Sequence, residues 1–203
     1  MRPPPNPWGD RRRVRVGLLG GSFNPAHDGH RHIAELSLKL LRLDEVWLLV
    51  SPQNPLKPAA GMAPLPRRLA SARAMAAGNP RLRATTIETR LGTRYTADTV
   101  IRLKRRFPLT RFVWLMGADN LVQMERWARW PRIFKAVPVA ILARGPYSAR
   151  ALAAKAAKRF GPNRRSGGRA RTLAGSPPPA WAFFRIRVHP ASSSAIRGQS
   201  PSQ

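Results

Sequence analysis

Short continuous apolar runs alternate with helical segments along this chain about six times, and this alternation constrains the fold more than any other feature. The apolar runs predict strands at 14–19, 46–50, 82–87, 112–116, 137–142 and 181–188. Apolar residues at helical spacing predict helices at 30–43, 65–77, 96–106 and 149–160, and a broken helical region at 121–134. Strands that are apolar throughout are typical of a sheet buried on both faces. The sequence therefore predicts an α/β fold, a parallel sheet with helices on both faces.

Composition bounds the size and the compartment of the protein. Of the 203 residues, 43% are hydrophobic, enough to bury the core of one domain. We expect a flexible tail over 1–13, a single domain over 14–203, and a long loop at 161–180, where large apolar side chains are few. The absence of cysteine excludes disulfides and thiolate metal sites. With no secretory signal and no apolar run near the ~20 residues that cross a bilayer, we expect a cytoplasmic protein without a membrane partner.

The charge balance is extreme. Lysine and arginine number 37 against 9 acidic residues, a net charge of +28, and the last acidic residue is Glu125. Such an excess suits a nucleic-acid partner or a polyanionic small substrate. The excess is spread along the chain and is not gathered on one helix face. The best explanation is therefore a general bias in amino-acid composition toward Arg, Ala, Pro and Gly, as expected from a GC-rich genome. Charge alone therefore decides little about function.

Chemistry is expected in the segments that follow the strands, because ligands of parallel sheets bind beyond the strands' carboxyl ends. In the first such segment, Gly20 and Gly21 allow a sharp turn and close approach of a ligand. His27 and His30 then lie on one side of a helix start, where free amides attract phosphate and both rings can donate to it. A zinc site that includes Asp28 is the weaker alternative, since no further ligands complete the shell and Asp28 suits a helix cap.

The last post-strand segment carries the same kind of chemistry. Ser192, Ser193 and Ser194 open a helix and can offer hydroxyls and amides to an anion, and Arg197 follows one turn later. Serine runs open many helices, so this segment gains weight from its pairing with the histidine segment at the same predicted edge.

Both segments resemble signatures of the nucleotidyltransferase superfamily, with its Rossmann-like fold: residues 27–30 resemble H-x-G-H, and residues 192–197 resemble S-S-T-x-I-R. Further stretches resemble the bacterial nicotinate-nucleotide adenylyltransferases; they are 51–57, 88–99, 117–121 with Trp127, and 144–147. The resemblance runs from about residue 15 to 197. The chain departs from the family pattern at Arg94 and Ser194, where serine and threonine are usual, and in the exchanged order of Gly145 and Pro146.

The resemblance implies a reaction in which the phosphate of nicotinate mononucleotide attacks ATP, giving deamido-NAD and pyrophosphate without a covalent enzyme intermediate. It implies that His27 and His30 are catalytic and that Ser193, Ser194 and Arg197 hold the pyrophosphate. The other ATP contacts that we expect are Gly20, Gly21, Ser22, Phe23 and Asp119, although Asp119 equally suits a helix cap. We expect Mg²⁺ to arrive with ATP, held by phosphates and water and not by a protein metal site.

For the second substrate, the resemblance implies that Trp127 stacks on the pyridine ring and that Tyr95 and Thr96, at a helix start, hold the nicotinate carboxylate. A carboxylate gains more from a helix start than a neutral carboxamide does, which favours the acid over nicotinamide mononucleotide. Lys57 is expected at a phosphate. Ordinary packing is the alternative for Trp127, with Trp130 nearby, and a solvated side chain is the alternative for Lys57.

Two other functions compete with this one. The first is adenylyl transfer to nicotinamide mononucleotide or another phosphate ester, such as phosphopantetheine. The second, of a different class, is a basic nucleic-acid-binding protein. Such a protein needs a basic stripe with exposed aromatic residues, whereas arginine is scattered here, so no specific nucleic-acid partner is expected. A homo-oligomer is compatible with the sequence, which does not decide the assembly.

Overall fold

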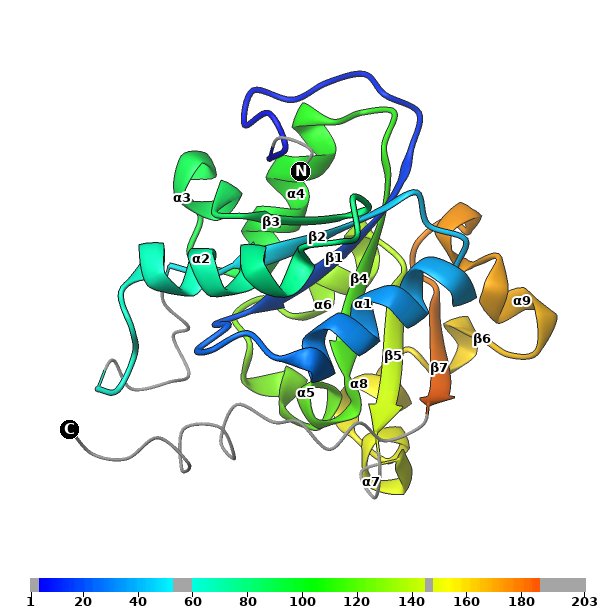
Figure 1. The fold of residues 1–203 in the computed structure, drawn as a ribbon. Helices are drawn as coiled ribbons and strands as arrows, with labels where there is room; N and C mark the ends of the chain where they lie inside the picture. Colours follow the sequence, from blue (N-terminus) through cyan, green and yellow to red (C-terminus); the bar gives the residue numbers. More distant parts are fainter. Residues whose placement is uncertain (1–3, 53–59, 145–147, 187–203) are drawn as a thin grey trace.

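The structure is a computed structural model that describes residues 4–52, 60–144 and 148–186 (Figure 1). Its centre is a sheet of seven strands, all parallel, in the order β3-β2-β1-β4-β5-β7-β6. The strands are β1 Arg15–Gly21, β2 Glu45–Val50, β3 Leu82–Thr85, β4 Arg111–Gly117, β5 Val139–Arg144, β6 Arg164–Arg165 and β7 Trp181–Ile186. The predicted Rossmann-like α/β class is thereby confirmed.

Helices cover both faces of the sheet (Figure 1). They are α1 Asp28–Leu40, α2 Leu65–Ala76, α3 Ile87–Leu91, α4 Thr96–Arg106, α5 Ala118–Gln123, α6 Pro131–Ala136, α7 Ser148–Leu152, α8 Lys155–Arg159 and α9 Gly168–Arg171. Successive strand residues point to opposite faces, so Leu18 packs in the core under α4, α5 and α6 while Leu19 packs under α1 and α2. Burial on both faces is why the strands are apolar throughout.

Two segments differ from the sequence prediction. The helix expected at 149–160 is two short helices, because Ala154 has an extended backbone. Ala151 and Ala156 lie five positions apart and would face different ways on one continuous helix; the break lets both enter the core. The loop expected at 161–180 contains β6, α9 and the 3₁₀ turns Gly161–Asn163 and Leu173–Gly175, held by the buried side chains of Ala170 and Leu173.

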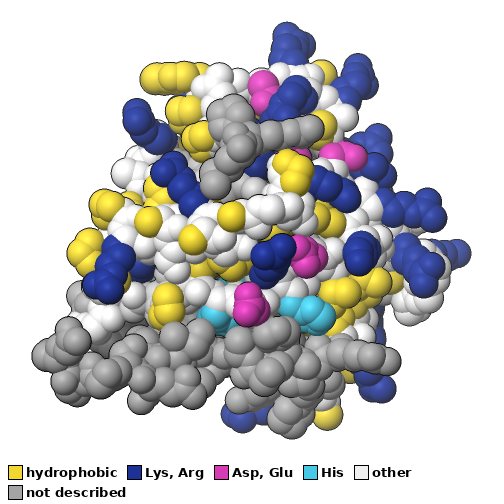
Figure 2. Space-filling model, viewed as in Figure 1, with side chains coloured by type: hydrophobic (Ala, Val, Ile, Leu, Met, Phe, Trp, Pro, Cys, Tyr) yellow, Lys and Arg dark blue, Asp and Glu magenta, His cyan; other side chains and the backbone are white. Residues whose placement is uncertain are grey.

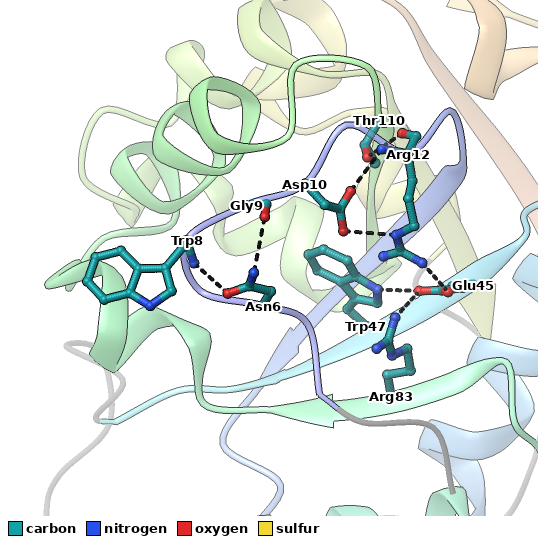
Figure 3. Close-up of polar contacts among 9 residues, drawn as sticks. All are labelled: Asn6, Trp8, Gly9, Asp10, Arg12, Glu45, Trp47, Arg83 and Thr110. Atoms are coloured by element: carbon teal, nitrogen blue, oxygen red, sulfur yellow. Dashed lines mark hydrogen bonds and ion pairs between the residues drawn. The ribbon is translucent and has the colours of Figure 1, made fainter.

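The N-terminal segment packs against the body of the protein, where the sequence predicts a flexible tail (Figure 3). Arg12 pairs with Glu45 at 3.0 Å, and the Arg106 guanidinium lies 5.6 Å from the ring centre of Trp8. Although burial opposes its ionisation, hydrogen bonds from Trp47 and Arg83 hold the pKa of Glu45 below its ordinary value. Arg12 thus helps to neutralise the buried carboxylate of Glu45, and this ion pair holds the N-terminal segment against the sheet. The single domain over 14–203 stays a prediction.

Candidate active site at the carboxyl ends of the strands

The strand order reverses between β1 and β4. From β1 the chain proceeds outward to β2 and β3, and from β4 it proceeds the other way to β5 and β7. The loops after β1 and β4 therefore diverge and leave room between them, which is where ligands of such sheets bind. The sequence predicts functional residues in both loops.

The histidine pair stands at the start of α1, after β1. His27 is the N-cap residue, and its Nδ1 accepts a hydrogen bond from the Gly29 backbone N–H at 3.1 Å. His30 Nδ1 accepts from the His27 N–H at 3.4 Å, and the two ring centres lie 3.9 Å apart. Since both Nδ1 atoms accept, each neutral ring carries its proton on Nε2 and is a donor there. The predicted cap, Asp28, is instead the first helical residue and is exposed.

The turn before the histidines is shaped by packing. Phe23 has a positive φ of 48°, is 1% exposed, and places its ring 4.8 Å from that of His30. A Cβ on Gly20 would lie 2.6 Å from Cη2 of Trp114, so only glycine fits above that indole. The side chains of Phe23 and Trp114 thus fix the turn on its core side, while the backbone at Gly20 is exposed to solvent.

Arg68 of α2 ties the first two post-strand loops together, and sequence reasoning missed it. Arg68 is 2% exposed, and its guanidinium donates to the carbonyl of Ser22 at 2.8 Å and to those of Ser51 and Pro52 at 2.7 and 2.8 Å. Its Nε donates to Ala63 O at 2.8 Å. Among so many basic residues, nothing in the sequence distinguishes this one as buried.

A second part of the site surrounds the start of α4, which begins at Thr96 as predicted. Tyr95 is the N-cap residue and makes no side-chain cap hydrogen bond. The guanidinium groups of Arg94 and Arg129 lie 6.0 and 5.9 Å from the Tyr95 ring centre, and Arg129 also pairs with Asp98 at 2.8 Å. Arg129 thereby joins the segment of Trp127 to this helix start, a contact between distant segments that the sequence could not indicate.

Trp127 and Trp130, which the sequence could not tell apart, differ in the structure. Trp130 is 8% exposed and packs among Phe134 and Phe160, whereas Trp127 is only partly buried. Trp127 packs edge-on against Trp114, with ring centres 6.3 Å apart. Because Trp114 also lies under Gly20, one indole supports both the histidine loop and Trp127.

Glu88 lies behind the start of α4. It is 7% exposed and accepts a hydrogen bond from Thr99 Oγ1 at 2.9 Å, and Thr99 Oγ1 lies 2.9 Å from the hydroxyl of Thr93. Burial raises the pKa of Glu88 to about 7, although the Thr99 hydrogen bond opposes this. The carboxyl group is therefore partly protonated at neutral pH.

The raised pKa of Glu88 predicts a pH-dependent stability. The folded protein binds this proton more tightly than the unfolded chain, whose glutamate has a pKa of 4.5. The stabilisation is fully present below about pH 4.5 and is lost as pH rises to about 7, on the order of 3 kcal/mol in all. Glu88→Gln should remove this slope from the free energy of unfolding measured by urea titration at each pH. Glu125→Gln, at an exposed position, is the matched control and should keep it; an unchanged slope in Glu88→Gln would contradict the assignment.

Asp119 stands at the carboxyl end of β4, beside β1. Its Oδ1 would lie 2.3 Å from a Cβ on Gly117, so the carboxylate folds back over that glycine. Gly117 is the N-cap residue of α5 and no side chain caps this helix, so the cap alternative for Asp119 is not what the structure shows.

Several predicted site residues lie outside the described residues: Lys57, Ser193, Ser194 and Arg197. Within the described ranges, no group of three or more histidine and acidic side chains could hold a metal ion. In the same ranges, every helix is too short or too polar to span a bilayer.

Known proteins resemble this chain over most of its length. Residues 18–199 match the family model described as cytidylyltransferase-like. A protein of Gluconacetobacter diazotrophicus named probable nicotinate-nucleotide adenylyltransferase is 54% identical over 87% of this chain and 82% of its own length. One of the same name from Parvibaculum lavamentivorans is 58% identical over 71% of each chain.

A solved structure gives the same fold. It is the Plasmodium falciparum nicotinic acid mononucleotide adenylyltransferase complexed with NaAD, and it matches with a TM-score of 0.66. The match covers 91% of this chain and 83% of that one, at 16% identity. At this identity the likeness shows the fold alone.

Proposed function

The chain belongs to the cytidylyltransferase-like family, among relatives named nicotinate-nucleotide adenylyltransferases, and we propose that it transfers the adenylyl group of ATP to nicotinate mononucleotide. The products are deamido-NAD and pyrophosphate. The observation that carries the proposal is the histidine pair at the start of α1, where both Nδ1 atoms accept backbone hydrogen bonds, at the reversal of strand order.

In this reaction a phosphate oxygen of the mononucleotide forms a bond to the α-phosphorus of ATP, and the bond from that phosphorus to the bridging oxygen breaks. Negative charge grows on the oxygens of the α-phosphate and on the departing pyrophosphate. His27 and His30 donate from Nε2 to these oxygens, and the start of α1 adds its free amides. No nucleophile of the chain is needed, so catalysis is positioning and charge stabilisation.

The remaining phosphate contacts extend this scheme. Gly20, Gly21, Ser22 and Phe23 would line the ATP side along the turn. Ser193, Ser194 and Arg197 would hold the pyrophosphate, and Lys57 a further phosphate. Mg²⁺ bound to ATP would neutralise phosphate charge, with Asp119 contacting ribose or a water of the ion.

The start of α4 supports recognition of an acid. Tyr95 and Thr96 would offer backbone amides and a hydroxyl to the nicotinate carboxylate, and Arg94 and Arg129 add positive charge beside Tyr95. A neutral carboxamide would gain less from both features. We therefore propose nicotinate mononucleotide over nicotinamide mononucleotide.

The test is pyrophosphate release from ATP and Mg²⁺ with each mononucleotide in turn. We expect turnover with the acid and kcat/KM at least tenfold lower with the amide. Equal turnover with both would remove the carboxylate argument. No turnover with either, together with salt-dependent binding of a generic oligonucleotide, would favour the nucleic-acid alternative.

Trp127→Ala should separate the two substrates. Loss of one stacking contact costs roughly 1–3 kcal/mol, so KM for the mononucleotide should rise roughly 5- to 150-fold. KM for ATP should stay within about threefold. Steady-state kinetics with each substrate varied in turn measures both values. Trp127→Phe, which keeps a flat ring, should recover most of the loss, and an equal rise in both KM values would indicate that Trp127 only packs.

A further inference from the structure

A hollow of about 280 Å³ lies at the free edge of the sheet, away from the histidine pair. β6 pairs with β7 only at Arg164–Trp181 and Arg165–Ala182, while β7 continues to Ile186. The hollow forms where β6 departs, between β7, the residues that follow β6, α9 and the last turn of α1. The thirteen residues of α1 separate it from His27 by roughly 20 Å, at 1.5 Å per residue.

Four arginines surround this hollow: Arg164 and Arg165 of β6, Arg171 of α9 and Arg185 of β7. Figure 2 shows Lys and Arg side chains gathered on the side of the molecule that carries α9. Arg164 is held by aromatic rings, its guanidinium 5.5 Å from the centre of Trp181 and 5.8 Å from that of Phe183. Because neighbouring strand residues face opposite ways, Arg164 and Arg165 approach the edge from both faces of the sheet.

No acidic residue lines the hollow, and none occurs in the sequence after Glu125. The ion pairs of the described residues involve none of the four arginines. Arg164, Arg171 and Arg185 are exposed, so water and salt screen much of the repulsion among these like charges. An anion bound among the four arginines would lower the repulsion that remains.

Arg165 adds a second, independent observation. Its Nε is shielded from solvent and finds no hydrogen-bond partner among the described residues. A buried donor on a charged group costs free energy until an acceptor meets it. The guanidinium fork matches the oxygens of phosphate and carboxylate groups, and several forks at once suit an anion with many oxygens.

We propose that this hollow binds a compact phosphate-bearing anion, at a site distinct from the adenylyl-transfer site. The size of the hollow suits a small anion and not a polymer. Proteins that bind nucleic-acid strands use exposed aromatic rings for stacking. Trp181, beside the hollow, is only 1% exposed. Among the described residues, the large apolar side chain that is exposed is Trp8, which lies in the N-terminal segment against Arg106 and not at the hollow. The proposal thus gives a binding role to four arginines that the proposed reaction does not use.

Calorimetric titration with inorganic pyrophosphate tests this proposal. The double variant Arg165→Ala/Arg171→Ala should bind one pyrophosphate fewer per chain than the wild type, or bind it at least tenfold more weakly. Its adenylyl-transfer rate should stay within about twofold, which also shows that it folds. Arg165→Lys/Arg171→Lys keeps the charge without the fork and should bind with intermediate affinity.

The matched control is Arg73→Ala/Arg105→Ala, which removes the same charge from exposed positions on α2 and α4 and should bind like the wild type. Equal weakening in both alanine pairs would mean that only net charge matters and would overturn the site. The same stoichiometry in all variants would also overturn it. So would an oligonucleotide that binds the four arginines more tightly than pyrophosphate, since the surface would then recognise a polymer.

Discussion

His30→Ala should lower kcat for pyrophosphate release by about 10²- to 10³-fold while the protein stays folded. This is the typical cost of removing one donor aimed at developing charge. The fold should tolerate the change, because the N-cap residue of α1 is His27 and the hydrogen bond that His30 Nδ1 accepts from the His27 N–H is long, at 3.4 Å. The measurement is kcat with both substrates saturating, beside the midpoint of thermal unfolding.

The neighbouring histidines provide the controls. His27→Ala loses a donor and also the N-cap bond to Gly29, so it should lose activity and about 1 kcal/mol of stability. His27→Asn can keep the cap and should lose activity alone. His32→Ala, on the same helix, should stay within about threefold of the wild type. Near-normal turnover by folded His30→Ala would remove His30 from the mechanism.

The parts of the fold that the sequence predicts well are those with large apolar residues in a regular pattern. Residues 96–106 place Val100 and Leu103 at helical spacing, and α4 has those bounds. Residues 161–180 were predicted as a loop because the side chains that anchor them include Ala170, Ala174 and Ala180, too small to produce a pattern.

The residues of the candidate site likewise fall into those that a sequence pattern predicts and those that it does not. Local motifs locate His27 and His30, because their function depends on one helix start. Arg129 and Trp114 were missed because each acts through contacts with distant segments: Arg129 reaches the start of α4, and Trp114 lies under Gly20 and Trp127. A sequence pattern reports neighbours along the chain and not neighbours across the sheet.

Arg68→Ala should lower both stability and kcat strongly. The change leaves the carbonyls of Ser22, Ser51, Pro52 and Ala63 without their donor. A buried acceptor left unsatisfied costs about 1–3 kcal/mol, and these four are partly buried, so the free energy of unfolding should fall by about 3 kcal/mol in all. The loop that carries Ser22 leads into the histidines, so kcat should fall at least tenfold, measured at a temperature where the variant is folded.

Chemical rescue separates positioning from stability. Millimolar guanidinium should enter the space left by Arg68→Ala, donate to the same carbonyls and restore part of kcat, whereas methylammonium at equal concentration should not. Arg68→Lys keeps the charge but gathers its donors at one point, so it can reach fewer of the four acceptors and should recover stability better than kcat. Restoration of kcat by both cations alike, or a Lys variant with wild-type kcat, would show that a buried charge suffices and that the fork does not position the loop.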